Sequence, residues 1–194
     1  DGKSDTTGFG TIQQAVDAAS SYDTIKVLPG TYDQGGATDG RMFSRVAILS
    51  KRIRLESTGG RDVTFIVGRH SAGAVHDDTA IRCVYADTAN TEIVGFTICE
   101  GDTKANSSDS DGCGGGLYAG KSDVRAIDCT FRNCWGSRGG ALYSGTAIRC
   151  LFVGNKMYNG ANGAIARASY LFNCIALNNI PGSQPALQGC NAVN

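Results

Sequence analysis

The feature that most constrains the fold is a strand pattern that recurs along the second half of the chain. Segments in which apolar or cysteine residues alternate with other residues recur with a spacing of 21 and then 24 residues. An earlier step of 33 residues contains a polar insertion of twelve residues, 101–112, and without it the spacing is again 21. Side chains alternate between the two faces of a strand, so the apolar or cysteine positions of each segment should share one face. The four predicted triplets are Val94, Phe96 and Ile98; Ile127, Cys129 and Phe131; Ile148, Cys150 and Phe152; and Phe172, Cys174 and Ala176.

A second strand precedes each of these segments. "CVYAD" (83–87), "GLYAG" (116–120) and "ALYSG" (141–145) align with one another and with the later "AIARA" (164–168) and "ALQGC" (186–190). A period of 21 to 24 residues that contains two strands has the length of one coil of a solenoid. The alignment predicts an inward series of Val84, Leu117, Leu142, Ile165 and Leu187, beside an outward column of Tyr85, Tyr118 and Tyr143.

The first part of the chain fits the same plan less regularly. Residues 8–21 are expected to form a capping helix, because Thr11 and Gln14 have the spacing of a capping box. We expect a single domain over 1–194, with irregular first coils over 22–80 and regular coils over 81–194. The final "NAVN" matches only part of a coil, so we expect the chain to be truncated there or capped by another molecule.

Two segments resemble known families. "TIQQAVDAASSYDTIKVLPGTY" (11–32) resembles the cap and first coil of the pectin-lyase-like superfamily, and "GGALY…FVGN" and "GGGLY…FRN" resemble the GGA[ILV] and FxxN repeats of polymorphic outer-membrane passengers. The resemblance implies an all-β solenoid: a right-handed single-stranded parallel β-helix with a short N-terminal capping α-helix. It implies little about function, since that superfamily holds lyases, hydrolases, adhesins and phage spikes.

Charge and hydropathy narrow the choice of partners. The 18 acidic and 18 basic side chains balance, which gives no electrostatic reason to expect nucleic acid. No apolar run approaches the roughly 20 residues that span a bilayer, so we expect no membrane span in this chain.

The tyrosine column is the main candidate for ligand binding. Aromatic faces repeated at the spacing of the coils could stack on sugar rings, and Arg82 and Asp87 lie nearby in the sequence to bind hydroxyl groups. Stacked tyrosines can also serve only to stabilise a sheet through cross-strand pairs. Both interpretations stay open at this point.

The acidic residues suggest a possible calcium site around the polar insertion. "DSDG" (109–112) alternates oxygen ligands and ends in glycine, although it lacks the rest of an EF-hand. The alternative is a solvated loop. The resemblance implies that a lyase would need such carboxylates together with an Arg or Lys base. The candidate ligands are Glu100, Asp102, Asp109, Asp111 and Asp123.

The eight cysteines allow both thiols and disulfides. Cys129, Cys150 and Cys174 share one inward position in successive coils, which favours a buried thiol stack, although the spacing of the coils also lies within the Cα range of a disulfide. The pairs Cys99 with Cys134 and Cys83 with Cys113 are the candidate disulfides, because they are expected near coil edges. His70 and His76 lie in segment 68–78, which we interpret as an exposed loop.

These observations together predict an extracellular or cell-surface module that binds glycan or mediates adhesion. One alternative is a polysaccharide-degrading lyase or hydrolase. The other is a filament subunit that associates end to end, which the apolar positions Leu151, Ile175 and Leu177 would favour.

Overall fold

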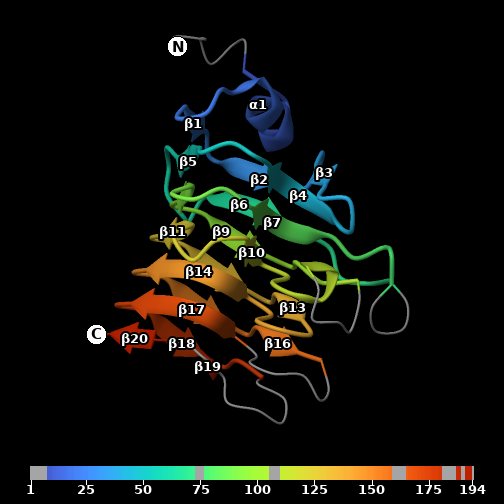
Figure 1. Ribbon diagram of the computed structural model, residues 1–194, viewed down its shortest axis with the longest axis vertical. Helices are drawn as coiled ribbons and strands as arrows, with labels where there is room; N and C mark the ends of the chain where they lie inside the picture. Colours follow the sequence, from blue (N-terminus) through green and yellow to red (C-terminus); the bar gives the residue numbers. More distant parts are fainter. Residues whose placement is uncertain are drawn as a thin grey trace.

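The computed structural model describes residues 8–72, 77–104, 110–158, 165–180, 187–188 and 191–193. It is mostly β, with one short α-helix near the start and strands that gather in largely parallel sheets (Figure 1). The elements are α1 (Ile12–Ala18), β1 (Thr24–Val27), β2 (Gly30–Tyr32), β3 (Ala37–Thr38), β4 (Phe43–Ile48), β5 (Arg54–Ser57), β6 (Thr64–Val67), β7 (Arg82–Ala86), β8 (Glu92–Val94), β9 (Thr97–Cys99), the 3-10 turn η2 (Ser110–Gly112), β10 (Leu117–Ala119), β11 (Arg125–Ile127), β12 (Thr130–Arg132), β13 (Trp135–Gly136), β14 (Leu142–Ile148), β15 (Leu151–Val153), β16 (Lys156–Met157), β17 (Ala166–Phe172), β18 (Ile175–Leu177), β19 (Leu187–Gln188) and β20 (Asn191–Val193).

Strands one period apart pair with each other in parallel. One sheet has the order β1-β5-β8-β11-β14-β10-β7-β4-β3, with β17 also paired to β14, and a second sheet has the order β18-β15-β12-β9-β6-β2. The antiparallel pair β3–β4 is a local hairpin, whose turn is held by the Asp39 carboxylate accepting from the backbone N–H groups of Arg41 and Met42. Together the strands curl into a half-barrel.

The strands that carry the tyrosines have the predicted register as far as β14. Leu117 pairs with Val84 and with Leu142, and all three side chains are fully buried. In the next strand Leu142 pairs with Ala166, so the predicted alignment with Ile165 is wrong by one residue, although Ile165 is buried in the core as predicted. The segment "AIARA" lacks the Leu–Tyr pair that sets the alignment of the earlier repeats.

The predicted inward triplets are correct at Phe96, Phe131 and Phe152, which are buried, but wrong at their first positions. A residue with positive φ precedes each Phe or Cys position, at Gly95, Asp128, Arg149 and Asn173 (φ 77°, 51°, 53° and 52°). A left-handed residue interrupts the two-residue alternation, so the inward side chain moves back by one position. The buried residues are therefore Ile93, Ala126, Ala147 and Leu171, while Val94, Ile127 and Ile148 are half-buried and Phe172 is exposed.

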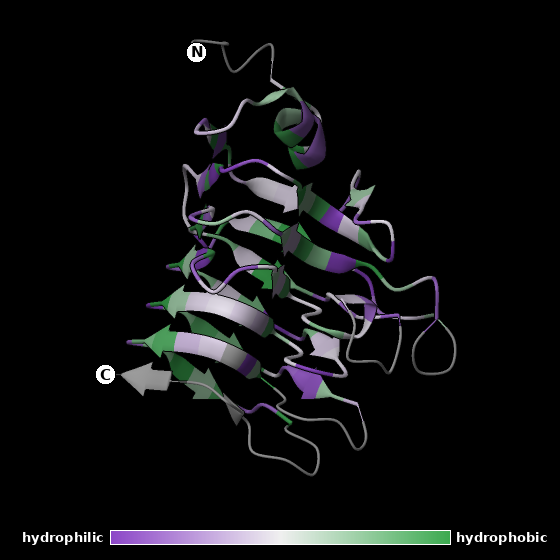
Figure 2. Ribbon diagram, viewed as in Figure 1, coloured by the Kyte–Doolittle hydropathy of each residue, from purple (hydrophilic) through white to green (hydrophobic). Residues whose placement is uncertain are grey.

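Helix α1 covers the edge of strand β4 and is shorter than the predicted 8–21. The predicted capping box is confirmed, since Thr11 Oγ1 accepts from the Gln14 N–H and Gln14 Oε1 accepts from the Thr11 N–H. Ile12 and Val16 are buried against the core, and the helix carries both hydrophobic and hydrophilic residues (Figure 2).

Gln13 completes this cover in a way that the sequence analysis missed. Its side-chain amide donates to the Ala47 carbonyl at 3.2 Å and accepts from the Ala47 N–H at 2.7 Å. The amide thus takes the place of a neighbouring strand and satisfies backbone groups that an edge strand leaves unpaired.

The two repeat motifs have clear physical roles. A Cβ at Gly115, in "GGGLY", would lie 1.9 Å from the Trp135 carbonyl oxygen, so only glycine allows the backbones to approach so closely. Asn155, the last residue of "FVGN", is buried and its side chain donates to the Phe131 carbonyl and accepts from the Cys134 N–H. Asn179 continues this ladder by accepting from Asn155 Nδ2 at 2.9 Å.

Candidate functional site

The predicted tyrosine column is present as three rings stacked in register. Tyr85 pairs with Tyr118 and Tyr118 with Tyr143 along strands β7, β10 and β14. The ring centroids are 5.3 Å and 5.4 Å apart, and the planes are inclined by only 2° and 8°. All three residues are half-buried. Parallel strands in strict register therefore turn one residue type into a regular surface ladder.

The mode of sugar binding expected from the sequence does not fit this geometry. Both faces of the Tyr118 ring are covered by its neighbours, so they cannot stack on a sugar ring. The ring edges and hydroxyl groups of Tyr85, Tyr118 and Tyr143 are still available to a ligand. Within the part of the chain that the structure describes, these three hydroxyls form no hydrogen bond. Burial raises the pKa of Tyr85 and of Tyr118, so these hydroxyls stay protonated and can donate.

Arg82 was expected to bind hydroxyl groups beside the tyrosines, and this expectation is wrong. Its side chain is fully buried, with its guanidinium carbon 5.8 Å and 5.2 Å from the ring centroids of Tyr85 and Tyr118. The guanidinium donates to the backbone carbonyls of Gly114 at 3.0 Å and Cys113 at 2.9 Å, and to that of Ser110. Arg82 therefore holds the loop before β10 rather than a ligand.

Arg82 also faces a buried acid. Its Nη1 lies 3.7 Å from Asp39 Oδ2, beyond hydrogen-bond distance, and neither atom has a hydrogen-bond partner among the described residues. Opposite charges at this range attract across a low-dielectric interior.

Asp87 likewise has a local role. Its Oδ1 accepts from the Ser50 N–H at 2.8 Å and from the Thr88 hydroxyl at 2.8 Å. It closes the turn after β4 and is half-buried, so it is occupied in the fold rather than held toward a ligand.

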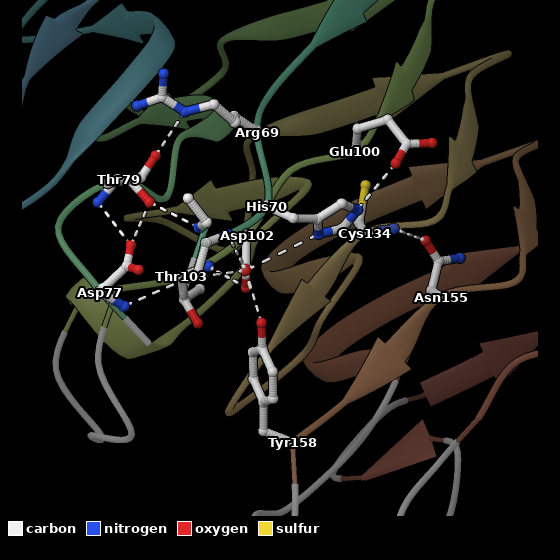
Figure 3. A network of polar contacts seen from close by, with 12 residues as sticks. Arg69, His70, Asp77, Thr79, Glu100, Asp102, Thr103, Cys134, Asn155 and Tyr158 are labelled. Atoms are coloured by element: carbon white, nitrogen blue, oxygen red, sulfur yellow. Dashed lines mark hydrogen bonds and ion pairs between the residues drawn. The ribbon is translucent and has the colours of Figure 1, made fainter. Parts of the chain in front are cut away.

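A second polar centre lies around Asp102, after strand β9 (Figure 3). Its side chain is fully buried, and Oδ2 accepts from the Tyr158 hydroxyl at 2.6 Å and from the N–H and hydroxyl of Ser71, while Oδ1 accepts from the Thr103 N–H. Burial alone would raise the pKa of Asp102, but these hydrogen bonds and the nearby His70 lower it below its ordinary value. Burial, together with the hydrogen bond to Asp102, raises the pKa of Tyr158.

His70 lies between two carboxylates at this centre. Its Nε2 is 2.9 Å from Glu100 Oε2, and its buried Nδ1 is 3.9 Å from Asp102 Oδ2 (Figure 3). The imidazole also lies against the Trp135 ring, with centroids 3.9 Å apart, and Tyr158 meets that indole edge-on. The interpretation of segment 68–78 as an exposed loop is therefore wrong at His70, whereas His76 lies outside the described residues.

The structure unites only part of the predicted calcium set. Glu100 and Asp102 share the His70 centre, Asp123 lies in the turn between β10 and β11, and Asp109 falls outside the described residues. Asp111 lies in η2. Among the residues that the structure places, no three His, Cys, Asp or Glu side chains converge as metal ligands. The Asp102 oxygens accept hydrogen bonds instead of facing an open site.

Sequence reasoning missed His70, Trp135 and Tyr158 as one cluster, since they come from three different periods. The available signal was positional: Trp135 follows β12 and Tyr158 follows β15 by a few residues each.

The predicted disulfides are replaced by thiols in the structure. Neither Cys99–Cys134 nor Cys83–Cys113 is bonded in the structure, where all four residues carry thiols. The Cys83 thiol donates to the Cys99 carbonyl at 3.1 Å, and burial raises the pKa of Cys99 to about 11. Cys83 instead lies beside Cys134, which follows strand β12.

Comparison with known proteins identifies no relative. The chain matches no family model, no curated protein and no solved structure. Of the parts of the chain described, no helix is long and apolar enough to cross a membrane. The function must therefore be argued from the geometry.

Proposed function

We propose that this chain is a right-handed single-stranded parallel β-helix, related to the pectin-lyase-like superfamily and to polymorphic outer-membrane passengers, that binds an extended glycan outside the cell. The parallel pairing of strands one period apart supports the fold. The motif resemblance supports the superfamily and the extracellular or cell-surface location. The tyrosine ladder supports the ligand class.

The single observation that carries the function is the regular spacing of three surface phenols. The ring spacing of 5.3–5.4 Å is close to the length of one pyranose unit in an extended polysaccharide. A glycan lying along the ladder would present hydroxyl groups at the same repeat as the tyrosines. Each phenol can donate one hydrogen bond and accept another, so the ligand is bound through ring edges and hydroxyls.

The alternative of a lyase or hydrolase has less support. Glu100 contacts His70, and Asp102 is buried and accepts four hydrogen bonds. This pair of carboxylates therefore does not face a substrate. A general acid or base must reach the proton that it transfers.

Self-association has one specific observation in its favour. Among the described strands, β18 is the edge of its sheet, and Ile175, Leu177 and nearby Ile180 are each more than half exposed. An exposed apolar edge strand is a common association surface. Sedimentation across a range of concentrations, with Ile175→Lys as the comparison variant, tests this second candidate: loss of a concentration-dependent species in the variant would support it.

The glycan proposal is tested by affinity electrophoresis in gels containing cellulose derivatives, xylan, mannan or pectate. The decisive variant is the triple change Tyr85→Phe, Tyr118→Phe and Tyr143→Phe, which keeps the ring stack and removes only the hydroxyls. Tyr170→Phe is the matched control, because Tyr170 is exposed on β17 outside the ladder.

We expect at least one extended polysaccharide to retard the wild-type protein and the control, and to leave the triple variant unretarded. Retardation of the triple variant equal to that of the wild type would contradict binding through the hydroxyls. Absence of retardation in every gel would contradict the glycan proposal itself.

A further inference from the structure

We propose that Cys150 and Cys174 form a site of reversible disulfide formation that links two successive coils. This site is independent of the glycan proposal, and the pair differs from both pairs predicted from the sequence. It rests on the register of the strands, on the exposure of one thiol and on the position of its strand at a sheet edge.

The two cysteines are neighbours across a parallel ladder. Leu151 pairs with Ile175, so the preceding residues, Cys150 and Cys174, are adjacent as well, and their thiols contact each other. Neighbouring strands lie about 4.7–4.9 Å apart, within the Cα separation of about 4.4–6.8 Å that disulfides span. The two thiols share one local contact, since each donates to the carbonyl two residues before it.

The position of β18 distinguishes this pair from Cys129 and Cys150, the preceding pair in the same column. A disulfide brings Cβ atoms closer than an ordinary ladder pair, so one strand must move toward the other. Strand β12 is held on both sides, by β9 and β15. Among the strands that the structure describes, β18 pairs with β15 alone in its sheet, so it can shift more easily.

Exposure decides which thiol reacts first. Cys129 and Cys150 are buried, whereas Cys174 is only half-buried. The contact with the Cys150 thiol lowers the pKa of Cys174 to about 7, whereas the contacts with Cys129 and then with Cys174, together with burial, raise the pKa of Cys150. The thiolate is the nucleophile in disulfide exchange, so Cys174 combines access with reactivity near neutral pH.

The oxidant is a small disulfide such as oxidised glutathione. The Cys174 thiolate attacks one sulfur of that disulfide, which forms a mixed disulfide and releases one small thiolate. Cys150 then loses its proton to solvent and attacks Cys174 Sγ, which forms the Cys150–Cys174 bond and releases the second small thiolate. Two protein thiols are oxidised and one small disulfide is reduced to two thiols.

The test treats the full chain with oxidised glutathione at pH 7.5, blocks the remaining thiols and maps disulfide-linked peptides by mass spectrometry. We expect a linked pair that contains Cys150 and Cys174, with the loss of two hydrogen atoms, and its disappearance in Cys174→Ala. Cys129→Ala is the matched control from the same column and should still form the link.

Thermal unfolding gives a second readout. The link closes a loop between successive coils, so the oxidised protein should unfold roughly 5–10 °C higher than the reduced protein, and reductant should reverse the shift. Three results would overturn the proposal: a glutathione adduct that persists on Cys174, a linked pair made of other cysteines, or a wild-type protein whose thiols all remain reduced. The wild-type peptide map settles the matter even where a variant fails to fold.

Discussion

Two aromatic ladders run across the parallel strands, one inside the molecule and one outside. Phe131 and Phe152 stack inside with centroids 4.9 Å apart and planes inclined by 4°. Tyr85, Tyr118 and Tyr143 stack outside with nearly the same geometry. The phenylalanines are fully buried, whereas the tyrosines are half-buried and end in hydroxyls.

The comparison shows that stacking follows from register alone and does not identify a binding site. Parallel strands bring equivalent residues together on either face, so both ladders contribute cross-strand contacts. Only the outer ladder adds hydrogen-bonding groups that the fold does not use. Substitutions in the inner ladder should therefore mainly lower the stability of the protein, whereas substitutions in the outer ladder should mainly weaken ligand binding.

The largest expected effect is on the inner ladder. Phe131→Ala should lower the free energy of unfolding by about 3–5 kcal/mol, because it removes a buried ring and leaves a cavity. Urea denaturation followed by circular dichroism measures the change. A loss no greater than that of Tyr118→Ala would contradict the difference between the two ladders.

The asparagine ladder, the polar counterpart inside the molecule, should come next. Asn155→Ala leaves the Cys134 N–H and the Phe131 carbonyl without these partners, at a cost of about 2–4 kcal/mol. Asn179→Ala is the matched comparison and should cost less, because Asn179 is only half-buried. Equal losses in the two variants, again from urea denaturation, would argue against an inward polar ladder.

Asp102 gives a prediction that depends on pH. Its folded pKa is lowered, so its ionised form stabilises the protein above the pKa of the unfolded chain, and this stability is lost as the pH falls through the folded pKa. Asp102→Asn should therefore cost about 2 kcal/mol at pH 7, where hydrogen bonds to a charged acceptor are lost.

The cost of Asp102→Asn should shrink in acid, where the wild-type carboxyl is also neutral. Unfolding measured from pH 7 down to pH 3 provides the check. A difference between the two proteins that stays constant over this range would contradict the assignment of Asp102 as a buried anion.

The smallest effects on stability belong to the outer ladder. Tyr118→Ala should cost about 1–2 kcal/mol, because it breaks two stacked pairs at a half-buried site. Tyr118→Phe keeps both stacks and should change the free energy of unfolding by no more than about 0.5 kcal/mol. A large loss on Tyr118→Phe would mean that its hydroxyl is used by the fold and is not available to a ligand.

Local periodicity in the sequence was enough to predict much of the fold. The repeat predicted the parallel register of Val84, Leu117 and Leu142, and the capping box predicted the start of α1. Both signals depend on residues close together in the chain or on strict repetition.

The errors have several physical origins, and the first is backbone conformation that side-chain patterns do not record. Alternation failed where Asp128 and Arg149 adopt positive φ, since most residues can take this conformation only when the surrounding fold enforces it. Arg82 was predicted at the surface because it lies near the outward Tyr85 in the sequence. In the fold it is buried and donates to the carbonyls of a loop about thirty residues away. The His70 centre was missed because its members lie in different periods.

The measurement that most directly tests glycan binding by the tyrosine ladder is affinity as a function of oligosaccharide length. The ligands are oligosaccharides of increasing length, made from the polysaccharide that retards the protein in the gels. Isothermal titration measures their binding to the wild-type protein and to the triple Tyr→Phe variant. Affinity is expected to rise with each added sugar until the chain spans all three hydroxyls and then to level off, with the triple variant showing no such rise. Affinity that does not depend on length, or that depends on it equally in both proteins, would contradict the account.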